Sequence, residues 1–466
     1  MKLEPKKKSL RNRLKNSVLE VILSSTSHGI PNIVRSSNMI VKLVWIASTL
    51  LSSGLCAYMI TQSFLKYFSY DVITKTRYIN EFKTIFPSVT VCNLNFFTSE
   101  NSIKFIKTLN DDIKFFRNPI ENDFHNIAKS LRKNFSNSDL IFGDTKEKLI
   151  VYCRSNTLEC DLDLIDYYNH PEHGACYTFN LREPYAVSFI PKKYFSLRLV
   201  LNISVPDENN FISASNGALV IIHNRTISPF QYEGICIPPK TEANIALSRT
   251  FYSSIPKPYS NCDGNTNDPN AYDSELYKLI HNNSKTYSQF LCVSLCGQRF
   301  IIKMCGCYYP MMLSFFNAKA CTIYDDSCYI KYYKTILASD YVNNVCLKEC
   351  PLECEGMTFQ KTISYNHFTN KDWIKYLQSY NKNDSLYFNK TIDPKHLVAV
   401  NVYHDSLSYI NIEESPTVSF VDLLSSIGGI AGLFMGVSVL SLVEIIEVFI
   451  QICLVFKSHV KVHESP

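Results

Sequence analysis

The chain has 466 residues, of which 46% are hydrophobic and 19% charged, and its formal net charge is +5. A charge this small over this length argues against a polycation that binds nucleic acid. Of the 17 cysteines, fifteen lie between Cys92 and Cys354, a density that is typical of an oxidising compartment rather than of the cytosol.

The first part of the chain, residues 1–38, is basic and precedes an apolar stretch. The segment "MKLEPKKKSLRNRLK" holds seven Lys and Arg residues, which predicts a cytoplasmic location by the positive-inside rule. The stretch from Met39 to Phe64 can cross a hydrocarbon core of roughly 30 Å, so residues 39–69 are predicted to form a first transmembrane helix. A signal peptide is disfavoured because about 40 polar or mixed residues come before it. A role of the basic run in binding nucleic acid or lipid headgroups is the alternative to a purely topological one.

Residues 70–419 are predicted to form an extracellular domain of mixed α+β structure. The segments "SLRLVLNISV" and "ALVIIHN" have the apolar pattern of strands, whereas "IKFIKTLNDDIKFF" and "HNIAKSLRKNF" have helical spacing. Neither internal repeats nor low-complexity linkers interrupt this region. All six N-x-S/T glycosylation acceptors lie in it, at Asn134, Asn202, Asn224, Asn282, Asn383 and Asn389.

A second apolar stretch, residues 420–456, precedes a short tail, residues 457–466, that is predicted to be cytoplasmic. Its length of about 37 residues exceeds the ~20 that lipid requires, so it is tilted, broken or extends beyond the bilayer. Ionisable groups in a span usually face a protein interior or a water-filled path. Steps of three or four residues place polar, acidic and small residues on one candidate pore-lining stripe: Asp422, Ser426, Gly429, Leu433, Gly436, Leu440, Glu444 and Glu447.

Simpler explanations of these residues stay open. Gly428, Gly432 and Gly436 recur at every fourth position, which also suits close packing of helices. The two glutamates could reach the cytoplasmic end of the span, and Asp422 could cap the start of the helix. A water-filled path would need several copies of the chain around an axis. Gly436-Val437-Ser438 could then offer carbonyls and a hydroxyl to a passing ion.

Five segments together resemble the degenerin/epithelial sodium channel family, which includes acid-sensing and peptide-gated channels. The similarity covers nearly the full length and is greatest to peptide-gated members such as those of cnidarians. Gly436-Val437-Ser438 stands where the family usually has Gly-Ala/Ser-Ser. The segments are "SSTSHGIPNI", "FPSVTVCNLN", "GACYTFN", "YSQFLCVSLCGQRFIIKMCGCYYP" and "LLSSIGGIAGLFMGVSVLSLVEIIE".

The resemblance implies a homo- or heterotrimer with related subunits in the plasma membrane, gated from outside and passing Na⁺, with both termini cytoplasmic. The extracellular domain would have palm, finger, thumb, knuckle and β-ball parts. Disulfides, rather than zinc, then explain the C-x-x-x-C and C-G-C spacings, so neither a metal site nor a cofactor is expected. The implied pairing leaves Cys236 without a partner in the extracellular domain. The implied pairs are Cys92–Cys176, Cys153–Cys160, Cys262–Cys354, Cys292–Cys350, Cys296–Cys346, Cys305–Cys328 and Cys307–Cys321.

The resemblance also implies roles for five residues in gating. His28 and Gly29 would form a re-entrant turn below the pore. Ser425 lies near the small position where bulky substitutions hold such channels open. Tyr70 and Tyr259 would form an aromatic pair that couples the extracellular domain to the spans, although the family more often has Trp where Tyr259 stands.

The thumb segment "CYIKYYKTILASDYVNNVC" bears on what opens such a channel. Acid-sensing relatives carry clustered carboxylates there, whereas Asp340 is the only acid in this segment after Cys328. We therefore expect an extracellular peptide ligand. Proton gating is the alternative, with His170 and His173 as candidate sensors.

A ring of Asp422 carboxylates would suit divalent cations, so Ca²⁺ is expected as a permeant or blocking ion. The alternative from another class is a non-conducting two-span receptor or adhesion protein, which would have no use for a stripe of acids in its second span. No nucleophile–base arrangement in the sequence suggests an enzyme.

Overall fold

The computed structural model describes residues 29–450 except for 96, 100–101, 103–141, 180–186, 205–214, 285, 310, 322–325, 339, 369–371, 374, 376–392, 439–440, 442, 445 and 448. The chain divides into two compact units. We call residues 1–73 together with 415–466 the helical unit, and Thr74–Glu414 the disulfide-rich unit. The two predicted helical segments at 103–116 and 125–135 lie outside the described residues.

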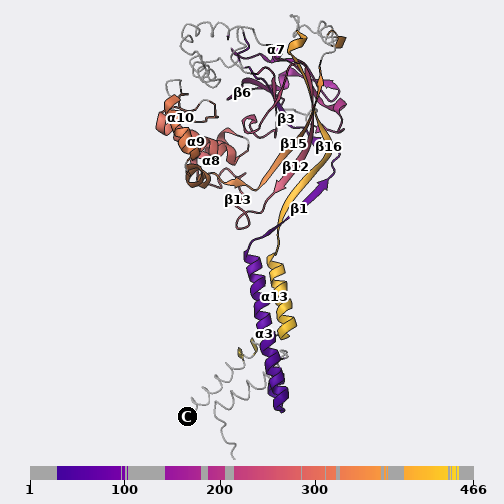
Figure 1. The fold of residues 1–466 in the computed structure, drawn as a ribbon, viewed down its shortest axis with the longest axis vertical. Coiled ribbons are helices and arrows are strands. Elements are labelled where there is room, and N and C mark those ends of the chain that lie inside the picture. Colours follow the sequence, from indigo (N-terminus) through magenta and orange to yellow (C-terminus); the bar gives the residue numbers. More distant parts are fainter. Residues whose placement is uncertain are drawn as a thin grey trace, which may run out of the picture. The chain divides into compact units, whose positions relative to one another are not determined.

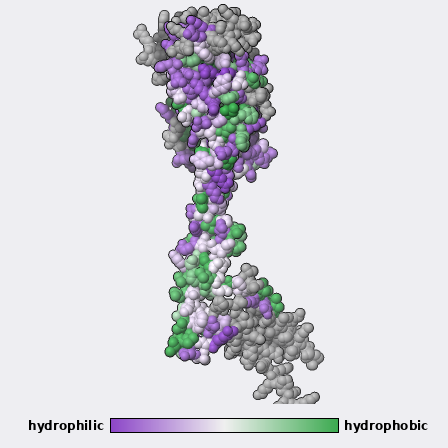
Figure 2. All heavy atoms as spheres, turned by 90° about the vertical axis from the view of Figure 1, so that its right-hand side faces the viewer, coloured by the Kyte–Doolittle hydropathy of each residue, from purple (hydrophilic) through white to green (hydrophobic). Residues whose placement is uncertain are grey.

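The helical unit contains α2 (Gly29–Arg35), α3 (Met39–Phe68) and α13 (Phe420–Met435). The apolar run from Met39 forms α3, which starts where the Asn38 side chain accepts a hydrogen bond from the backbone N–H of Ile40. In the described part of the chain, α3 is the one helix that is long and apolar enough to cross a membrane, and α13 is a shorter apolar helix. The two helices lie side by side, and hydrophobic residues cover much of their surface (Figures 1 and 2).

The disulfide-rich unit is built around two large sheets (Figure 1). The first sheet is mixed, since β12 and β16 pair in parallel and the other registered pairs are antiparallel. Its order is β15-β12-β16-β9-β4-β5, and β1 also pairs with β16. These strands are β1 (Val72–Ile79), β4 (Ile150–Ser155), β5 (Leu158–Glu159), β9 (Leu197–Asn202), β12 (Thr241–Ser253), β15 (Glu355–His367) and β16 (Leu397–Pro416).

The second sheet is antiparallel, with the order β11-β10-β3-β7-β6. All six residues of β3, of β7 and of β10 are buried, as expected for strands that are covered on both faces. The strands are β3 (Ser88–Asn93), β6 (Ile165–His170), β7 (Gly174–Phe179), β10 (Ala218–His223) and β11 (Ile235–Ile237).

The main hydrophobic core lies between the two sheets. It joins fully buried residues of both, such as Val91 from β3 and Leu199 and Ile245 from the first sheet. The strands predicted at "SLRLVLNISV" and "ALVIIHN" are β9 and β10, and both contribute to this core. A sandwich of this kind buries one face of each sheet and accounts for the mixed α+β class.

Helices of the disulfide-rich unit pack around a second core of Leu, Tyr and Cys side chains. The longest, α9 (Gln289–Cys305), ends where Gly306 adopts a left-handed φ of 73°, which glycine favours. The other helices of the disulfide-rich unit are α7 (Lys146–Leu149), whose Leu149 belongs to the main core, α8 (Glu275–Asn283), α10 (Asp326–Ala338), the π-helix η6 (Val342–Cys346) and α11 (Leu347–Glu349).

Short elements complete the description. Two small sheets pair β2 (Thr84–Ile85) with β8 (Val187–Ser188) and β13 (Cys262–Asp263) with β14 (Leu352–Glu353). The 3-10 turns are η1 (Leu162–Leu164), η2 (Lys193–Phe195), η4 (Pro229–Gln231) and η7 (Pro394–His396).

Candidate pore-lining segment and gating elements

The helix α13 begins with a capping box. The Ser419 hydroxyl accepts a hydrogen bond from the backbone N–H of Asp422 at 3.1 Å, and the Asp422 carboxylate accepts from the backbone N–H of Ser419 at 3.0 Å. The Ser419 hydroxyl also donates to this carboxylate at 2.7 Å. The capping role that the sequence left open for Asp422 is therefore present. A ring of Asp422 carboxylates stays a prediction.

Two faces of α13 differ in exposure. Leu423 is 5% exposed, and Ile427, Ile430 and Phe434 are half-buried on the same side, while α13 packs along α3. The predicted lining residues of this helix, Asp422, Ser426, Gly429 and Leu433, are all exposed, Leu433 by 80%. Ser425, the predicted gating position, is exposed as well. The helical spacing thus brings these predicted site residues to the surface that α3 leaves open.

The glycines of α13 make few contacts within the chain. A Cβ added at Gly428 or Gly429 would meet nothing within 4 Å, and one at Gly432 would meet only the carbonyl oxygen of Val437, at 3.6 Å. Close packing against α3 therefore does not explain Gly428 and Gly429.

A helix break follows at the predicted constriction. Gly436 has a left-handed φ of 68°, which a residue with a Cβ rarely adopts, and residues 436–438 are not helical. The backbone N–H of Gly436 donates to the carbonyl of Gly432, and that of Ser438 donates to the Ser441 hydroxyl at 3.0 Å. Glycine thus ends one helical segment, and the Ser438–Ser441 pair starts the next.

The break interrupts the single stripe that helical spacing predicts over the whole stretch. Its residues from Asp422 to Leu433 share a face of α13, but Glu444 and Glu447 belong to the segment beyond the break. Leu440 and residues 451–456 lie outside the described residues. A lining role for the two glutamates stays a prediction.

Gly29, the first residue of α2, lies against the middle of α3. A Cβ placed on Gly29 would be 2.8 Å from the Thr49 hydroxyl oxygen and 2.9 Å from its methyl carbon, closer than side chains pack. Thr49 is itself held by a 2.7 Å hydrogen bond to the carbonyl of Trp45. The close approach needs glycine at position 29. His28 lies outside the described residues.

A strained turn connects α3 to β1. Tyr70 has a φ of 54°, and its ring contacts those of Tyr67 and Phe68 with centroids 6.5 and 6.3 Å apart. The carbonyl of Asp71 accepts a 2.8 Å hydrogen bond from the backbone N–H of Thr417, just before α13. Tyr259 belongs to the disulfide-rich unit, so its pairing with Tyr70 stays a prediction.

All seven disulfides implied by the resemblance are present in the disulfide-rich unit. Four of them attach residues of α9 or of the segment that follows it to later parts of the chain. The other three are Cys92–Cys176, Cys153–Cys160 and Cys262–Cys354. Among the described cysteines, the exposed Cys236 and the buried Cys56 are free.

A family model described as "Amiloride-sensitive sodium channel" matches residues 22–448. The chain belongs to this family. The match runs from the region of Gly29 through the seven disulfides to the acidic segment beyond Gly436, and it confirms the resemblance to the family. The greater similarity to peptide-gated members stays a prediction.

Members of the amiloride-sensitive sodium channel family are among the relatives of this chain. The epithelial sodium channel subunit gamma of Xenopus laevis is 30% identical over 320 residues, 66% of this chain and 46% of that protein. Subunit beta of Bos taurus is 29% identical over 331 residues, which are 70% of this chain and 50% of that protein. Subunit alpha of Neoceratodus forsteri is 29% identical over 360 residues, which are 74% of this chain and 51% of that protein. The chain spans about half the length of these curated relatives.

One solved structure, a proton-activated chloride channel determined by cryo-EM, aligns with 88% of this chain and 98% of that one. Its TM-score is 0.32 and the sequence identity is 6%.

Three of the six predicted glycosylation acceptors lie in the part of the chain that the structure describes. Asn282 is exposed near the end of α8, and Asn224 is half-buried in the turn after β10. Asn202 ends β9, and its side chain accepts a 3.1 Å hydrogen bond from the backbone N–H of Ser204. Asn134, Asn383 and Asn389 lie outside the described residues, and modification of all six stays a prediction.

The two candidate proton sensors lie together where β6 turns into β7, with His170 at the end of β6 and His173 in the turn. Their rings are 4.8 Å apart, and His170 is 4% exposed rather than solvated. With Glu172 they form the one group found among the described residues whose ligand atoms could hold a metal ion. However, Nδ1 of His170 accepts hydrogen bonds from the backbone N–H groups of Glu172 and His173 at 3.1 and 3.3 Å. The lone pair on Nδ1 is therefore used in these two hydrogen bonds, which stabilise the turn.

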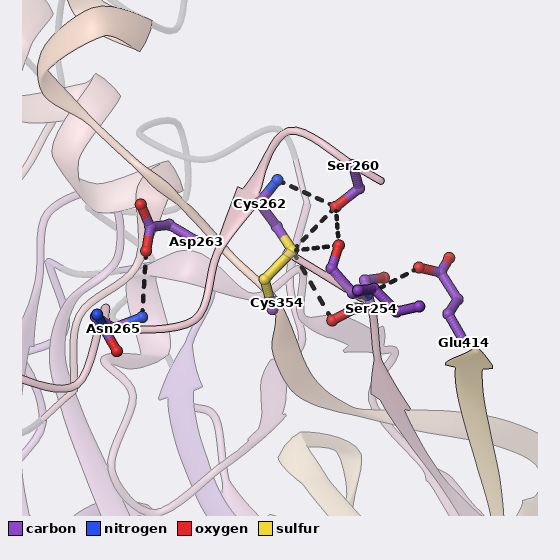
Figure 3. Close-up of a disulfide and its surroundings, with 8 residues drawn as sticks. Ser254, Ser260, Cys262, Asp263, Asn265, Cys354 and Glu414 are labelled. Carbon is purple, nitrogen blue, oxygen red and sulfur yellow. Dashed lines mark hydrogen bonds between the residues drawn. A yellow bond between two sulfur atoms is a disulfide. The ribbon is translucent and has the colours of Figure 1, made fainter. Parts of the chain in front are cut away.

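Sequence reasoning missed two buried histidines and one pair of acids. Burial lowers the pKa of His223 to about 4. Burial and the nearby Arg249 charge lower the pKa of His404 to about 4. Asp263 follows Cys262 and Glu353 precedes Cys354, so both acids are next to a disulfide (Figure 3 for Asp263). Each of these acids is next to a cysteine of this disulfide in the sequence. Because the resemblance implied the disulfide, the sequence could have predicted that the two acids lie near each other.

Proposed function

We propose that the chain is a subunit of a trimeric, amiloride-sensitive cation channel of the plasma membrane that passes Na⁺ and is opened by an extracellular peptide. Family membership supports cation conduction, and the names of the relatives, subunits alpha, beta and gamma, support assembly with related chains. The observation that carries the proposal is the exposed face of α13 followed by the break at Gly436.

The exposed face argues for a water-filled path between copies. Asp422 and Ser426 would be costly in contact with lipid, so α13 needs further protein or water on the side that α3 leaves open. Non-helical backbone, such as that of residues 436–438, is tolerated at membrane depth only where it is buried in protein or lines a cavity. One chain offers too few helices to enclose such a cavity. Several copies around an axis satisfy both requirements.

The proposed topology places α3 and α13 in the membrane, both termini in the cytoplasm and the disulfide-rich unit outside. Seven disulfides in one unit support an oxidising surrounding. The glycosylation acceptors fit the same side.

A peptide is preferred over protons as the opening signal. The thumb lacks a pair of acids after Cys328, and the pKa values of His223 and His404 lie near 4, below the range of mild acidification. His170 and His173 keep acid gating as the second candidate.

Oocyte recordings test the proposal. Oocytes that express the chain are perfused with acid and then with RFamide-type peptides, with and without amiloride. We expect an inward Na⁺ current with peptide that amiloride blocks, and little current with acid alone. An acid-evoked current without a peptide response would establish proton gating instead. A chain that reaches the surface by biotinylation and conducts under no condition, even with co-expressed related subunits, would contradict the channel proposal.

A further inference from the structure

A cavity of about 470 Å³ lies in the disulfide-rich unit, beside the Cys262–Cys354 disulfide. Its wall comes from the turn after β10, the end of β12, β13, the start of α9, β14 and the start of β15. Three acids line it, Asp263, Glu353 and Glu355. In the part of the chain that the structure describes, no Lys, Arg or His lines it and no ion pair is made by any of these acids.

Two of these acids stand directly opposite each other. In the parallel pair of β13 and β14, Asp263 is the register partner of Glu353, so both side chains leave the same face of the ribbon. A cation held between the two carboxylates would pair with both charges. Hydrogen bonds hold the carboxylates in place: Asp263 accepts from the backbone N–H of Asn265 at 3.3 Å, and Glu353 from that of Gln289 at 3.0 Å (Figure 3 for Asp263). Burial raises the pKa of Glu353, which shows that its charge lacks full solvation.

Aromatic rings form another part of the wall. Tyr232, Tyr252 and Phe290 line the cavity, and Tyr252 and Phe290 are 41% and 56% exposed. A Cβ on Gly356, the register partner of Tyr252, would clash with the Tyr252 side chain, so the ring rests directly on this glycine. Ring faces next to carboxylates favour a cation that can stack, and guanidinium does so.

The size of the cavity separates an organic cation from a metal ion. A Ca²⁺ ion would draw six to eight oxygen ligands around itself, whereas this cavity is wide and partly aromatic.

We propose that this cavity binds the guanidinium group of an arginine-containing extracellular ligand between Asp263 and Glu353, with Tyr252 and Phe290 against its faces. The inference rests on the proposed function for the identity of the ligand as the opening peptide. Binding itself can be measured without any current.

The test uses the purified full-length protein and its melting temperature. The probes are L-argininamide, its neutral counterpart L-citrullinamide, and CaCl₂. We expect argininamide alone to raise the melting temperature, and its apparent affinity to fall about tenfold or more in Asp263→Asn/Glu353→Gln. Gly356→Ala displaces the Tyr252 ring while keeping the charges, and should weaken binding several-fold. Asp273→Asn, an exposed acid outside the cavity, is the matched control and should bind as the native chain does.

Equal shifts with both amides, a shift that persists in the double variant, or a response to CaCl₂ alone would overturn the inference. If the double variant fails to fold, Glu353→Gln is scored in its place by the same criteria. In oocytes, the half-activating concentration of an arginine-containing peptide should rise about tenfold in the folded variant. Selective argininamide binding without any current would refute the channel proposal and support the site. A peptide current unchanged by the substitutions would refute the site alone.

Discussion

His223 shows how a single buried side chain makes stability depend on pH. It ends β10, is 3% exposed, and its Nε2 lies 2.9 Å from the Thr90 hydroxyl, while Nδ1 lies 2.9 and 3.0 Å from the carbonyls of Asn224 and Ile227. These partners fix a neutral ring that donates from Nδ1 and accepts at Nε2. Burial opposes a charge on it, which is why its pKa falls to about 4.

The pKa of His223 predicts a loss of stability in acid. The unfolded chain binds the proton near the ordinary pKa of about 6.5 and the folded chain only near 4, so stability should fall as pH decreases through this window. The full contribution is on the order of 3 kcal/mol. Chemical denaturation at several pH values between 7 and 4 measures the free energy of unfolding. This free energy should decrease less with falling pH in His223→Gln than in His396→Gln, a control in the partly exposed turn η7. Equal slopes would contradict the assignment.

Asp422 combines a charge with a capping role, and two substitutions separate them. Asp422→Asn removes the charge and keeps an oxygen that can accept from Ser419, whereas Ser419→Ala removes the capping hydroxyl and keeps the charge. If the carboxylates act as a ring, Asp422→Asn alone should change the reversal potential in Ca²⁺ and the block by Ca²⁺. If Asp422 is only a cap, Ser419→Ala should lose about 1 kcal/mol of stability and Asp422→Asn less, with permeation unchanged in both variants.

At the scale of the elements, α2 is held against α3 by a contact that tolerates no side chain. Gly29→Ala forces its new methyl group against Thr49 and should displace α2. We expect reduced current per channel at the surface for Gly29→Ala, and recovery in the double variant Gly29→Ala/Thr49→Ala, where the space is returned. Currents normalised to biotinylated surface protein measure this. A double variant as impaired as the single one would show that position 29 acts by other means.

The exposed face of α13 leads to a prediction at the scale of the whole molecule. If several copies surround a path, Leu433 faces other copies or the path, while Leu423 is covered within its own chain. Cysteine at position 433 should therefore be modified by a water-soluble thiol reagent with a large loss of current, and cysteine at position 423 should not. Cross-linking of the intact assembly should end at three copies. Modification at 423 but not at 433 would contradict the orientation of α13.

Sequence patterns predicted the elements whose formation depends on local composition. The apolar run of α3, the strands β9 and β10 and the exposed face from Asp422 to Leu433 follow from spacing alone. The seven disulfides followed only from the family resemblance, because spacing permits many pairings. Helical periodicity assumed an unbroken helix through Gly436 and could not show that this glycine is left-handed. The opposition of Asp263 and Glu353 depends on a strand register between segments about 90 residues apart, which no local pattern contains.

The backbone bond between Thr417 and Asp71 also has a mechanical consequence. β1 and β16 are the strands that continue into α3 and α13, and they pair with each other. Where they leave the sheet, the Thr417 N–H bonds to the Asp71 carbonyl and the Ser415 hydroxyl to that of Ile73. The two connections, from α3 into β1 and from β16 into α13, are therefore bonded to each other as well as to their own helices. Separating α3 from α13 at this end would require breaking these hydrogen bonds.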